Sequence, residues 1–305
     1  MKILIFGNGA WGAALASHFA RIDHDVTVWS RSGSSAPDGC TPLSGDILPD
    51  ANIYVLATPT QTTRSILTQF KDQFVAGASC LITAKGIELG SLSLQSDIMA
   101  EVVPNVRPAI LTGPSFAKDV TAGKPTALTV AAADLDHAND IRDALSGEGI
   151  RVYSSDDMIG AQIGGALKNV IAIGCGIVIG RGLGASAQAA LMTRGFAELA
   201  RLGMALGGDL ETLSGLSGLG DLTLTCHSQT SRNFSYGYAL GQTGKAPTTG
   251  TFEGAKTAQA ALDLGARKGI SMPITKAVAA IIADPALMDA AIVGLLNRPL
   301  KDEAL

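Results

Sequence analysis

The sequence predicts an α/β protein in which a doubly wound parallel sheet is followed by an all-helical C-terminal half. Up to about residue 156, short apolar runs alternate with stretches long enough for crossover helices, a pattern typical of a parallel sheet. A glycine-rich turn follows the first of these runs directly. From residue 158 onward the chain shows helical stretches broken by glycine-rich loops, and no run typical of a strand.

The elements of the first half follow in order. Residues 2–6 form an apolar run that ends at a glycine, as a buried parallel strand does, and residues 10–21 are alanine-rich with helical spacing. Residues 26–29 predict a second strand. Further strands are expected at residues 53–57, 79–83, 109–112, 127–131 and 151–153. Residues 32–50, rich in Ser, Pro, Gly and Asp, predict an irregular connection.

The second half reads as helices only. Its clearest helices are residues 186–206 and 254–268. The longest apolar run, residues 170–179, is interrupted by two glycines and is too short to span a bilayer, so it predicts a buried helix. The change of pattern predicts two domains, residues 1–157 and residues 158–305.

Composition excludes several classes of protein. Of the 305 residues, 47% are hydrophobic and 16% charged, which excludes a disordered chain. A net charge of −4 without a basic run argues against a nucleic-acid partner, so a few placed cations must hold any anionic ligand. The four cysteines form no C-x-x-C pair, and Cys226 beside His227 gives too few ligands for a metal site such as zinc. Asn8 and neighbouring glycines break the apolar N-terminal stretch, which argues against a secretory signal. We expect a cytoplasmic protein with reduced thiols and no membrane insertion.

A dinucleotide-binding motif follows the first strand. The segment Gly7-Asn8-Gly9-Ala10-Trp11-Gly12 is a G-x-G-x-x-G that opens a helix. In such a motif the first glycine makes the turn, the second lets the backbone approach a pyrophosphate, and the third lets helix and strand pack closely. The helix N-terminus adds free N–H groups and partial positive charge. The context predicts a Rossmann-like dinucleotide site.

The end of the second strand bears on which dinucleotide binds. A site restricted to NAD usually places Asp or Glu there, to hold the ribose 2′-hydroxyl. This sequence has Ser30 and Arg31 instead. An arginine can pair with a 2′-phosphate, although Arg31 could equally be an ordinary surface residue. We therefore expect NADP to be accepted, with NAD not excluded.

Polar residues follow later strands, where an open α/β sheet places its ligands. Lys85 follows one expected strand, and Gly113 and Ser115 follow another. Lys168 lies among small and apolar residues, which would desolvate its ammonium and lower its pKa toward the value a general base needs. A lysine snorkelling to the surface is the alternative.

The segment 215–222 has three glycines before Asp221, and so many glycines are costly in a helical region unless the backbone turns sharply or approaches a ligand. Asp221 could orient a lysine or accept a hydrogen bond from a hydroxyl. Ser231, Arg232 and Asn233 offer adjacent donors for a phosphate, and the arginine supplies a bidentate fork. Both segments could instead cap helices.

With these residues in view, the chain resembles the NAD(P)-dependent glycerol-3-phosphate dehydrogenases of the bacterial type. The motifs are G-N-G-A-W-G at 7–12, A-K-G at 84–86, G-P-S-F-A at 113–117, A-L-K-N at 166–169, G-L-x-G-x-G-D-L at 215–222, T-C-x-S at 225–228 and S-R-N at 231–233. The resemblance implies that Lys168 is the proton acceptor. The substrate contacts it implies are Lys85, Gly113, Ser115, Lys168, Asp221, Ser231, Arg232 and Asn233. The cofactor contacts it implies are Gly7, Gly9, Ala10, Trp11, Gly12, Arg31, Lys85, Ala117, Arg232, Thr251 and Glu253.

Three positions depart from the family pattern. Ala10 stands where the family usually has serine, Thr251 stands where it commonly has an aliphatic residue, and the connection 32–50 is shorter than usual.

The implied reaction is reversible hydride transfer between NAD(P)(H) and glycerol 3-phosphate or dihydroxyacetone phosphate, which would supply phospholipid synthesis. A homodimer is a further expectation. The alternatives are a related two-domain β-hydroxyacid dehydrogenase or ketopantoate reductase, whose substrates present a carboxylate, and a non-catalytic NAD(P)-sensing protein. A sensor would need no base, which disfavours it against the pair Lys168 and Asp221.

Overall fold

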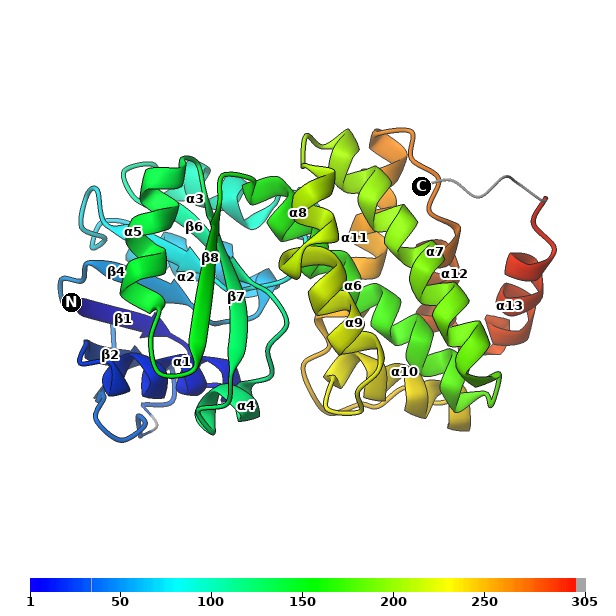
Figure 1. Cartoon of the computed structure of the whole chain (residues 1–305), viewed down its shortest axis with the longest axis horizontal. Helices are drawn as coiled ribbons and strands as arrows, with labels where there is room; N and C mark the ends of the chain where they lie inside the picture. The colour runs from blue at the N-terminus through cyan, green and yellow to red at the C-terminus, as the bar shows by residue number, and fades with distance from the viewer. Residues whose placement is uncertain (34, 300–305) are drawn as a thin grey trace.

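The computed structural model describes residues 1–33 and 35–299 and has two halves side by side (Figure 1). An α/β half carries the N-terminus, and a helical half carries the C-terminus. Between them the last strand ends at Ser155 and the first long helix begins at Met158, with Asp157 capping that helix. The division into two domains at residue 157 stays a prediction.

The α/β half is built on one eight-stranded sheet in the order β3-β2-β1-β4-β5-β6-β7-β8. The strands are β1 (Lys2–Phe6), β2 (Asp25–Trp29), β3 (Thr41–Leu43), β4 (Ile53–Leu56), β5 (Ser79–Ile82), β6 (Arg107–Thr112), β7 (Thr126–Ala132) and β8 (Ile150–Ser155). Buried runs of Val, Ile and Leu in the central strands suit a sheet covered on both faces, whereas the edge strand β3 is mostly exposed.

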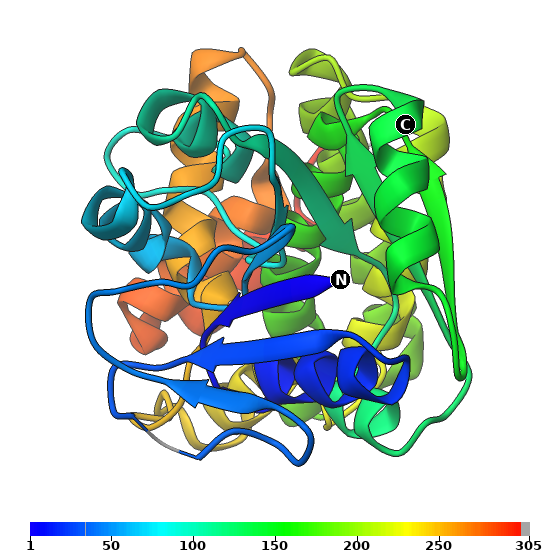
Figure 2. The same cartoon turned by 90° about the vertical axis from the view of Figure 1, so that its left-hand side faces the viewer.

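Helices cover both faces of the sheet, so the predicted doubly wound fold is confirmed (Figure 2). On one face α1 (Ala10–Arg21) and α5 (Leu135–Leu145) bury their apolar sides against the strands, together with Val120 of the short α4 (Ala117–Thr121). On the other face α2 (Thr63–Phe70) and α3 (Gln95–Val102) do the same.

Two details of the sheet differ from the sequence prediction. β7 runs antiparallel to β6, although every other pairing is parallel. The connection at residues 113–125 holds only the five-residue α4, too short for the crossover that a parallel partner needs. Residues 41–43, inside the predicted irregular connection, form the edge strand β3. Pro42 is tolerated in β3 because an edge strand has a free side that needs no N–H donor.

The second half contains no strand within residues 158–299, as predicted. Its helices are α6 (Met158–Gly180), α7 (Gly184–Ala205), α8 (Leu210–Ser214), α9 (Asp221–Cys226), α10 (Arg232–Thr243), α11 (Glu253–Arg267), α12 (Pro273–Ala283) and α13 (Met288–Leu296). By length and composition α6 could cross a membrane, but 89% of its most apolar stretch is buried inside the protein. It is the central helix of this half.

Helix α10 packs on α6 backbone to backbone, and glycines permit that approach. A Cβ at Gly176 would lie 2.1 Å from the carbonyl oxygen of Phe234, and one at Gly237 would lie 2.0 Å from that of Ile173. Gly180 and Gly241 extend the same contact. No side chain separates the two helices at these points, so their relative position is fixed by main-chain contact.

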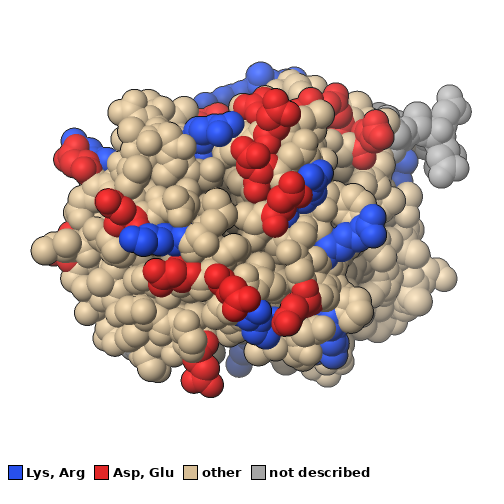
Figure 3. Space-filling view, turned by 60° about the vertical axis from the view of Figure 1, so that its left-hand side comes forward, with Lys and Arg blue, Asp and Glu red and all other residues tan. Residues whose placement is uncertain are grey.

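Basic and acidic side chains are interspersed on the face in Figure 3, with no continuous basic area on that face. The four cysteines are free thiols, and three of them are buried.

Candidate active site

A cavity of about 500 Å³ lies at the carboxyl ends of β1, β4, β5 and β6, where the sheet meets the helical half. Its lining comes from the loops after these strands and from α6, α9, α10 and the start of α11. The predicted residues that line it are Gly9, Ala10, Trp11, Lys85, Ser115, Ala117, Lys168, Ser231, Arg232, Asn233, Thr251 and Glu253.

The glycine-rich loop has the geometry that its motif requires. Gly7 adopts a φ of +108°, and a Cβ there would lie 2.8 Å from the carbonyl oxygen of Ala57. A Cβ at Gly12 would lie 2.0 Å from the carbonyl oxygen of Gly7. At Gly9 the same Cβ would meet nothing within 4 Å, so the backbone is open toward the cavity. The turn, the helix N-terminus and this open approach fit a dinucleotide pyrophosphate.

Arg31 is exposed and does not line the cavity, whereas Ser30 is buried. Both follow β2, whose last residue, Trp29, accepts a hydrogen bond at its carbonyl from the backbone N–H of Gly7, at 2.9 Å. Arg31 therefore lies at the same carboxyl end of the sheet as the glycine loop, but outside the cavity.

Two lysines converge on one buried carboxylate. Lys168 of α6 donates to Asp221 Oδ1 at 2.5 Å, and Lys85, after β5, donates to Asp221 Oδ2 at 2.7 Å. Thr225, one helical turn after Asp221 in α9, accepts from Lys168 Nζ at 2.9 Å. Asp221 is fully buried and does not line the cavity, so it contacts the lysines and not the cavity space.

Burial sets the protonation of this group. Desolvation lowers the pKa of Lys168 to about 8, although the charge of Asp221 opposes the change. Burial also disfavours the Asp221 carboxylate, but the charges of Lys168 and Lys85 outweigh burial and hold its pKa below the usual value. A lysine that titrates near neutral pH beside a permanent carboxylate is suited to accept and return a proton.

The glycine-dense segment places Asp221. Leu216–Gly220 forms a single π-helical turn, and α9 starts at Asp221. A Cβ at Gly164 of α6 would lie 2.7 Å from the carbonyl oxygen of Ser217. Gly164 thus allows the turn to lie against α6, while a Cβ at Gly218 would lie 1.9 Å from the carbonyl oxygen of Leu213 in α8. The contact with α6 brings Asp221 beside Lys168.

The S-R-N segment forms the start of α10. Ser231 is its N-cap and accepts from the backbone N–H of Phe234 at 3.2 Å, so the capping interpretation holds for this residue while it also lines the cavity. Asn233 donates to Asn169 at 2.9 Å and accepts from the N–H of Gly254 at 3.1 Å. These bonds tie α6, α10 and α11 together around the cavity.

Of the predicted residues, Gly7, Gly12, Arg31, Gly113 and Asp221 do not line the cavity. Gly113 directly follows β6, adopts a φ of +119° and lies two residues before Ser115, which lines the cavity. Sequence reasoning gave no role to Asn169, Thr225 and Lys118, which do line it. Thr225 carried a signal, since its spacing of four from Asp221 puts both side chains on one helix face. Within the described residues no group of three or more His, Cys, Asp or Glu is placed to hold a metal ion.

Comparison with known proteins settles the family. Residues 2–38 and 44–138 match the N-terminus of NAD-dependent glycerol-3-phosphate dehydrogenase, and residues 157–292 match its C-terminus. The chain belongs to the NAD-dependent glycerol-3-phosphate dehydrogenase family. A glycerol-3-phosphate dehydrogenase of Bradyrhizobium diazoefficiens that uses NAD(P)+ is 44% identical over 320 residues, covering 99% of this chain and 98% of the relative.

Solved structures agree with this family assignment. The crystal structure of glycerol-3-phosphate dehydrogenase from Coxiella burnetii superposes with a TM-score of 0.89 at 32% identity, covering 97% of this chain and 99% of the other. A ketopantoate reductase from Ralstonia eutropha, one of the alternatives from sequence, reaches a TM-score of only 0.58 at 16% identity over 96% of this chain and 100% of the other. That likeness shows a common fold alone. The predicted resemblance to glycerol-3-phosphate dehydrogenases is confirmed, and the protein is an NAD(P)-dependent enzyme of this family.

Proposed function

We propose that the protein transfers hydride reversibly between NAD(P)(H) and glycerol 3-phosphate or dihydroxyacetone phosphate, with Lys168 as the proton-transfer group. The observation that carries the proposal is the Lys85–Asp221–Lys168 cluster at the wall of the cavity. A bound nicotinamide cofactor supplies or accepts the hydride.

Lys168 performs the proton chemistry. In the oxidation of glycerol 3-phosphate the neutral amine takes the proton of the C2 hydroxyl. In the reduction of dihydroxyacetone phosphate the ammonium polarises the ketone and protonates the developing alkoxide. Asp221 and Thr225 orient the Nζ atom for both directions. Lys85, with 20% of its side chain exposed at the cavity, contributes a second positive charge beside the C2 oxygen.

The opposite end of the substrate is a phosphate, and the start of α10 suits it. Arg232 offers a guanidinium at the cavity wall, while Ser231 and Asn233 flank it. The free N–H groups of the helix N-terminus add partial positive charge. Of the cations lining the cavity, Lys85 and Lys168 share the charge of Asp221, and Lys118 donates to Thr230 Oγ1 at 2.9 Å. We therefore propose Arg232, with its forked guanidinium, as the main anchor for the phosphate. Ser115 lines the wall, and Gly113 makes the turn after β6 that leads to it.

The cofactor lies along the glycine loop in this proposal. Gly7, Gly9, Ala10 and Gly12 hold the pyrophosphate at the N-terminus of α1, while Trp11, Ala117, Thr251 and Glu253 complete the wall. In this proposal the exposed Arg31 meets the 2′-phosphate of NADP beyond the cavity. The absence of a carboxylate at the end of β2 favours acceptance of NADP as well as NAD. We further propose that the enzyme works in the cytoplasm, as a homodimer, and supplies glycerol 3-phosphate for phospholipid synthesis.

Substrate assays test the proposal directly. We expect the absorbance of NADPH, and that of NADH, to decay with dihydroxyacetone phosphate and to stay constant with ketopantoate or a 3-oxo acid. The ratio of the two rates measures the cofactor preference. Turnover of a carboxylate substrate without turnover of dihydroxyacetone phosphate contradicts the proposal, and cofactor binding without any turnover favours a sensor.

The pKa of Lys168 predicts opposite pH dependences for the two directions. Because glycerol 3-phosphate oxidation needs the neutral amine, its kcat/KM should rise with pH and level off above an apparent pKa of about 8. Dihydroxyacetone phosphate reduction needs the ammonium, so its kcat/KM should fall above the same pKa. Initial rates measured in both directions over a pH series check this. A transition near the ordinary lysine value of about 10.4 would contradict the lowered pKa of Lys168.

A further inference from the structure

The loop that carries Lys85 runs from the end of β5 to the start of α3, over residues 83–94. It bridges the two halves of the protein, because Lys85 reaches Asp221 of α9 while Ile87 is fully buried in the core of the helical half. Leu92 in this loop has a φ of +64°, a conformation that costs energy for a residue with a branched side chain. The loop therefore needs support from outside itself.

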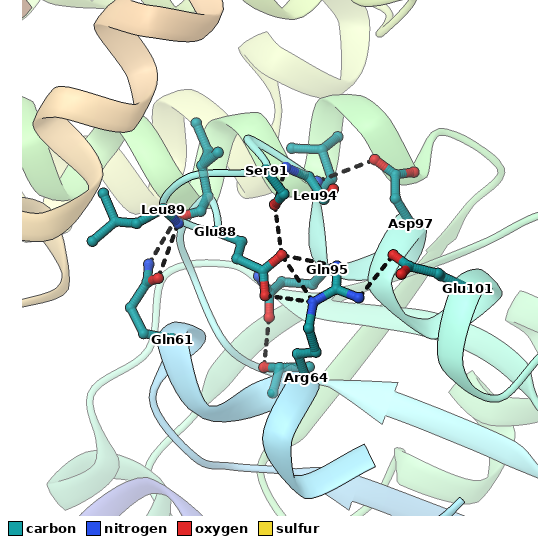
Figure 4. Close-up of polar contacts among 12 residues, drawn as sticks. Gln61, Arg64, Glu88, Leu89, Ser91, Leu94, Gln95, Asp97 and Glu101 are labelled. Carbon is teal, nitrogen blue, oxygen red and sulfur yellow. Dashed lines mark hydrogen bonds and ion pairs between the residues drawn. The ribbon is translucent and has the colours of Figure 1, made fainter. Parts of the chain in front are cut away.

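Arg64 of α2 supplies part of that support. Its Nε donates to the two carboxylate oxygens of Glu88 at 2.9 and 3.1 Å, and its Nη2 donates to Glu88 Oε2 at 2.9 Å (Figure 4). Ser91, in the same loop, donates to Glu88 Oε2 at 2.5 Å. Hydrogen bonding from Arg64 holds the pKa of Glu88 below its usual range, so the pair stays charged at neutral pH. A planar, forked contact of this kind fixes both distance and orientation.

Gln61 in the 3-10 turn η1 (Thr60–Thr62) supplies the rest. Its amide donates to the carbonyl of Ile87 at 2.8 Å and accepts from the N–H of Leu89 at 3.0 Å (Figure 4). One side chain thus holds the backbone on both sides of Glu88. Gly86 of the loop packs closely against two threonines, since a Cβ there would lie 2.7 Å from Thr60 Oγ1 and 2.9 Å from Thr257 Oγ1.

We infer that Arg64 and Gln61 are positioning residues for the reaction: they hold the loop so that the Lys85 ammonium stays on Asp221. This inference rests on the proposed roles of Lys168 and Lys85. Lys85 lies three residues before Glu88 in the loop, and its Nζ lies 2.7 Å from Asp221 Oδ2. A displacement of the loop by a fraction of an ångström therefore stretches that contact. Neither positioning residue lines the cavity or touches the space where the reaction occurs.

The inference predicts a signature that a stabilising role alone would not give. The charged groups acting on Lys168 are Asp221, which raises its pKa, and Lys85, which lowers it, with Cys226 as a lesser neighbour. When Lys85 moves away from Asp221, Lys168 loses the repulsion of a nearby cation. Its affinity for a proton then increases, and the pH profile of oxidation moves to higher pH.

The experiment compares Arg64→Met and Gln61→Met with Glu101→Gln in the full-length enzyme. Arg64 also pairs through Nη1 with Glu101 at 2.8 Å, but Glu101 lies on α3, outside the loop, with 63% of its side chain exposed. We expect each positioning variant to lose about tenfold in kcat/KM for glycerol 3-phosphate, the cost of a misplaced group, and its apparent pKa to rise above about 8. The Glu101→Gln control should retain the wild-type rate and pH profile.

A Lys85→Met background separates positioning from folding. There Arg64→Met should cost little further activity, because the group that it positions is already absent. Should Arg64→Met fail to fold, Glu88→Gln and Gln61→Met apply the same test with smaller changes. Equal losses in both backgrounds, or a lower Tm with unchanged kinetics, would overturn the inference. If Lys168→Ala is inactive while the Arg64 and Gln61 variants behave as wild type, only this inference fails, whereas an active Lys168→Ala variant removes the proposed function itself.

Discussion

The Lys168→Ala variant is expected to lose about 10³-fold or more in kcat in both directions, since it removes the group that exchanges a proton with the C2 oxygen. Its fold should persist, because Asp221 keeps Lys85 as a charged partner and is not left as an unpaired buried carboxylate. Steady-state rates, with circular dichroism to check folding, measure the outcome.

Two companion variants assign the loss to proton transfer. Lys168→Arg keeps the positive charge but holds its proton at every accessible pH, so it should be nearly as inactive as the alanine variant. Lys71→Ala removes an exposed lysine that follows α2 and should act like the wild type. A Lys168→Arg enzyme with near-normal oxidation would show that charge, and not proton acceptance, is what this position provides.

A large loss of stability is expected from Gly237→Ala. The added methyl group would lie 2.0 Å from the carbonyl oxygen of Ile173, so α10 must move away from α6. Overpacking usually costs about 1–3 kcal/mol, and a clash with main chain rather than with a flexible side chain belongs at the upper end or above it. Thermal unfolding should show a lower Tm, and the yield of folded protein should fall.

Gly294→Ala is the matched control for that variant. Gly294 also lies in a helix, α13, but a Cβ there meets nothing within 4 Å. Alanine at an open helical position is more stable than glycine by about 0.5–1 kcal/mol, so the Tm should rise slightly. Equal Tm values for the two variants would contradict the main-chain contact between α6 and α10.

The sequence predicted most of the fold because the central strands are continuous apolar runs. These runs alternate with stretches long enough for helices, which is the pattern of a doubly wound sheet. It missed the direction of β7, since direction depends on where the connection 113–125 returns to the sheet and not on strand composition. It missed β3 because Thr41, Pro42 and Leu43 have no strong strand pattern and pair only as an edge.

For the site, the motifs named the groups but not their mutual contacts. Lys85, Lys168 and Asp221 lie 53 to 136 residues apart along the chain, so no local spacing could reveal that one carboxylate joins both lysines. The glycines of 215–222 predict a sharp turn or an approach to a ligand, and the structure shows a π-helical turn packed against Leu213 of α8 and against Gly164 of α6. The spacing of four residues between Asp221 and Thr225 would put both side chains on one face of a helix. The sequence did not predict that helix, so the contact of Thr225 with Lys168 became apparent only in the structure.

The glycine contact between α6 and α10 also fixes the distance between residues carried by these two helices. Lys168 lies on α6 and Arg232 begins α10, so with the proton-transfer group and the phosphate anchor at these two positions their span is held by helix backbones in direct contact. Side-chain replacements around the cavity can change its polarity, yet they leave that span unchanged. Accommodating a longer phosphorylated ketone would then require α10 to move relative to α6, and a change of cavity side chains alone would not bring that about.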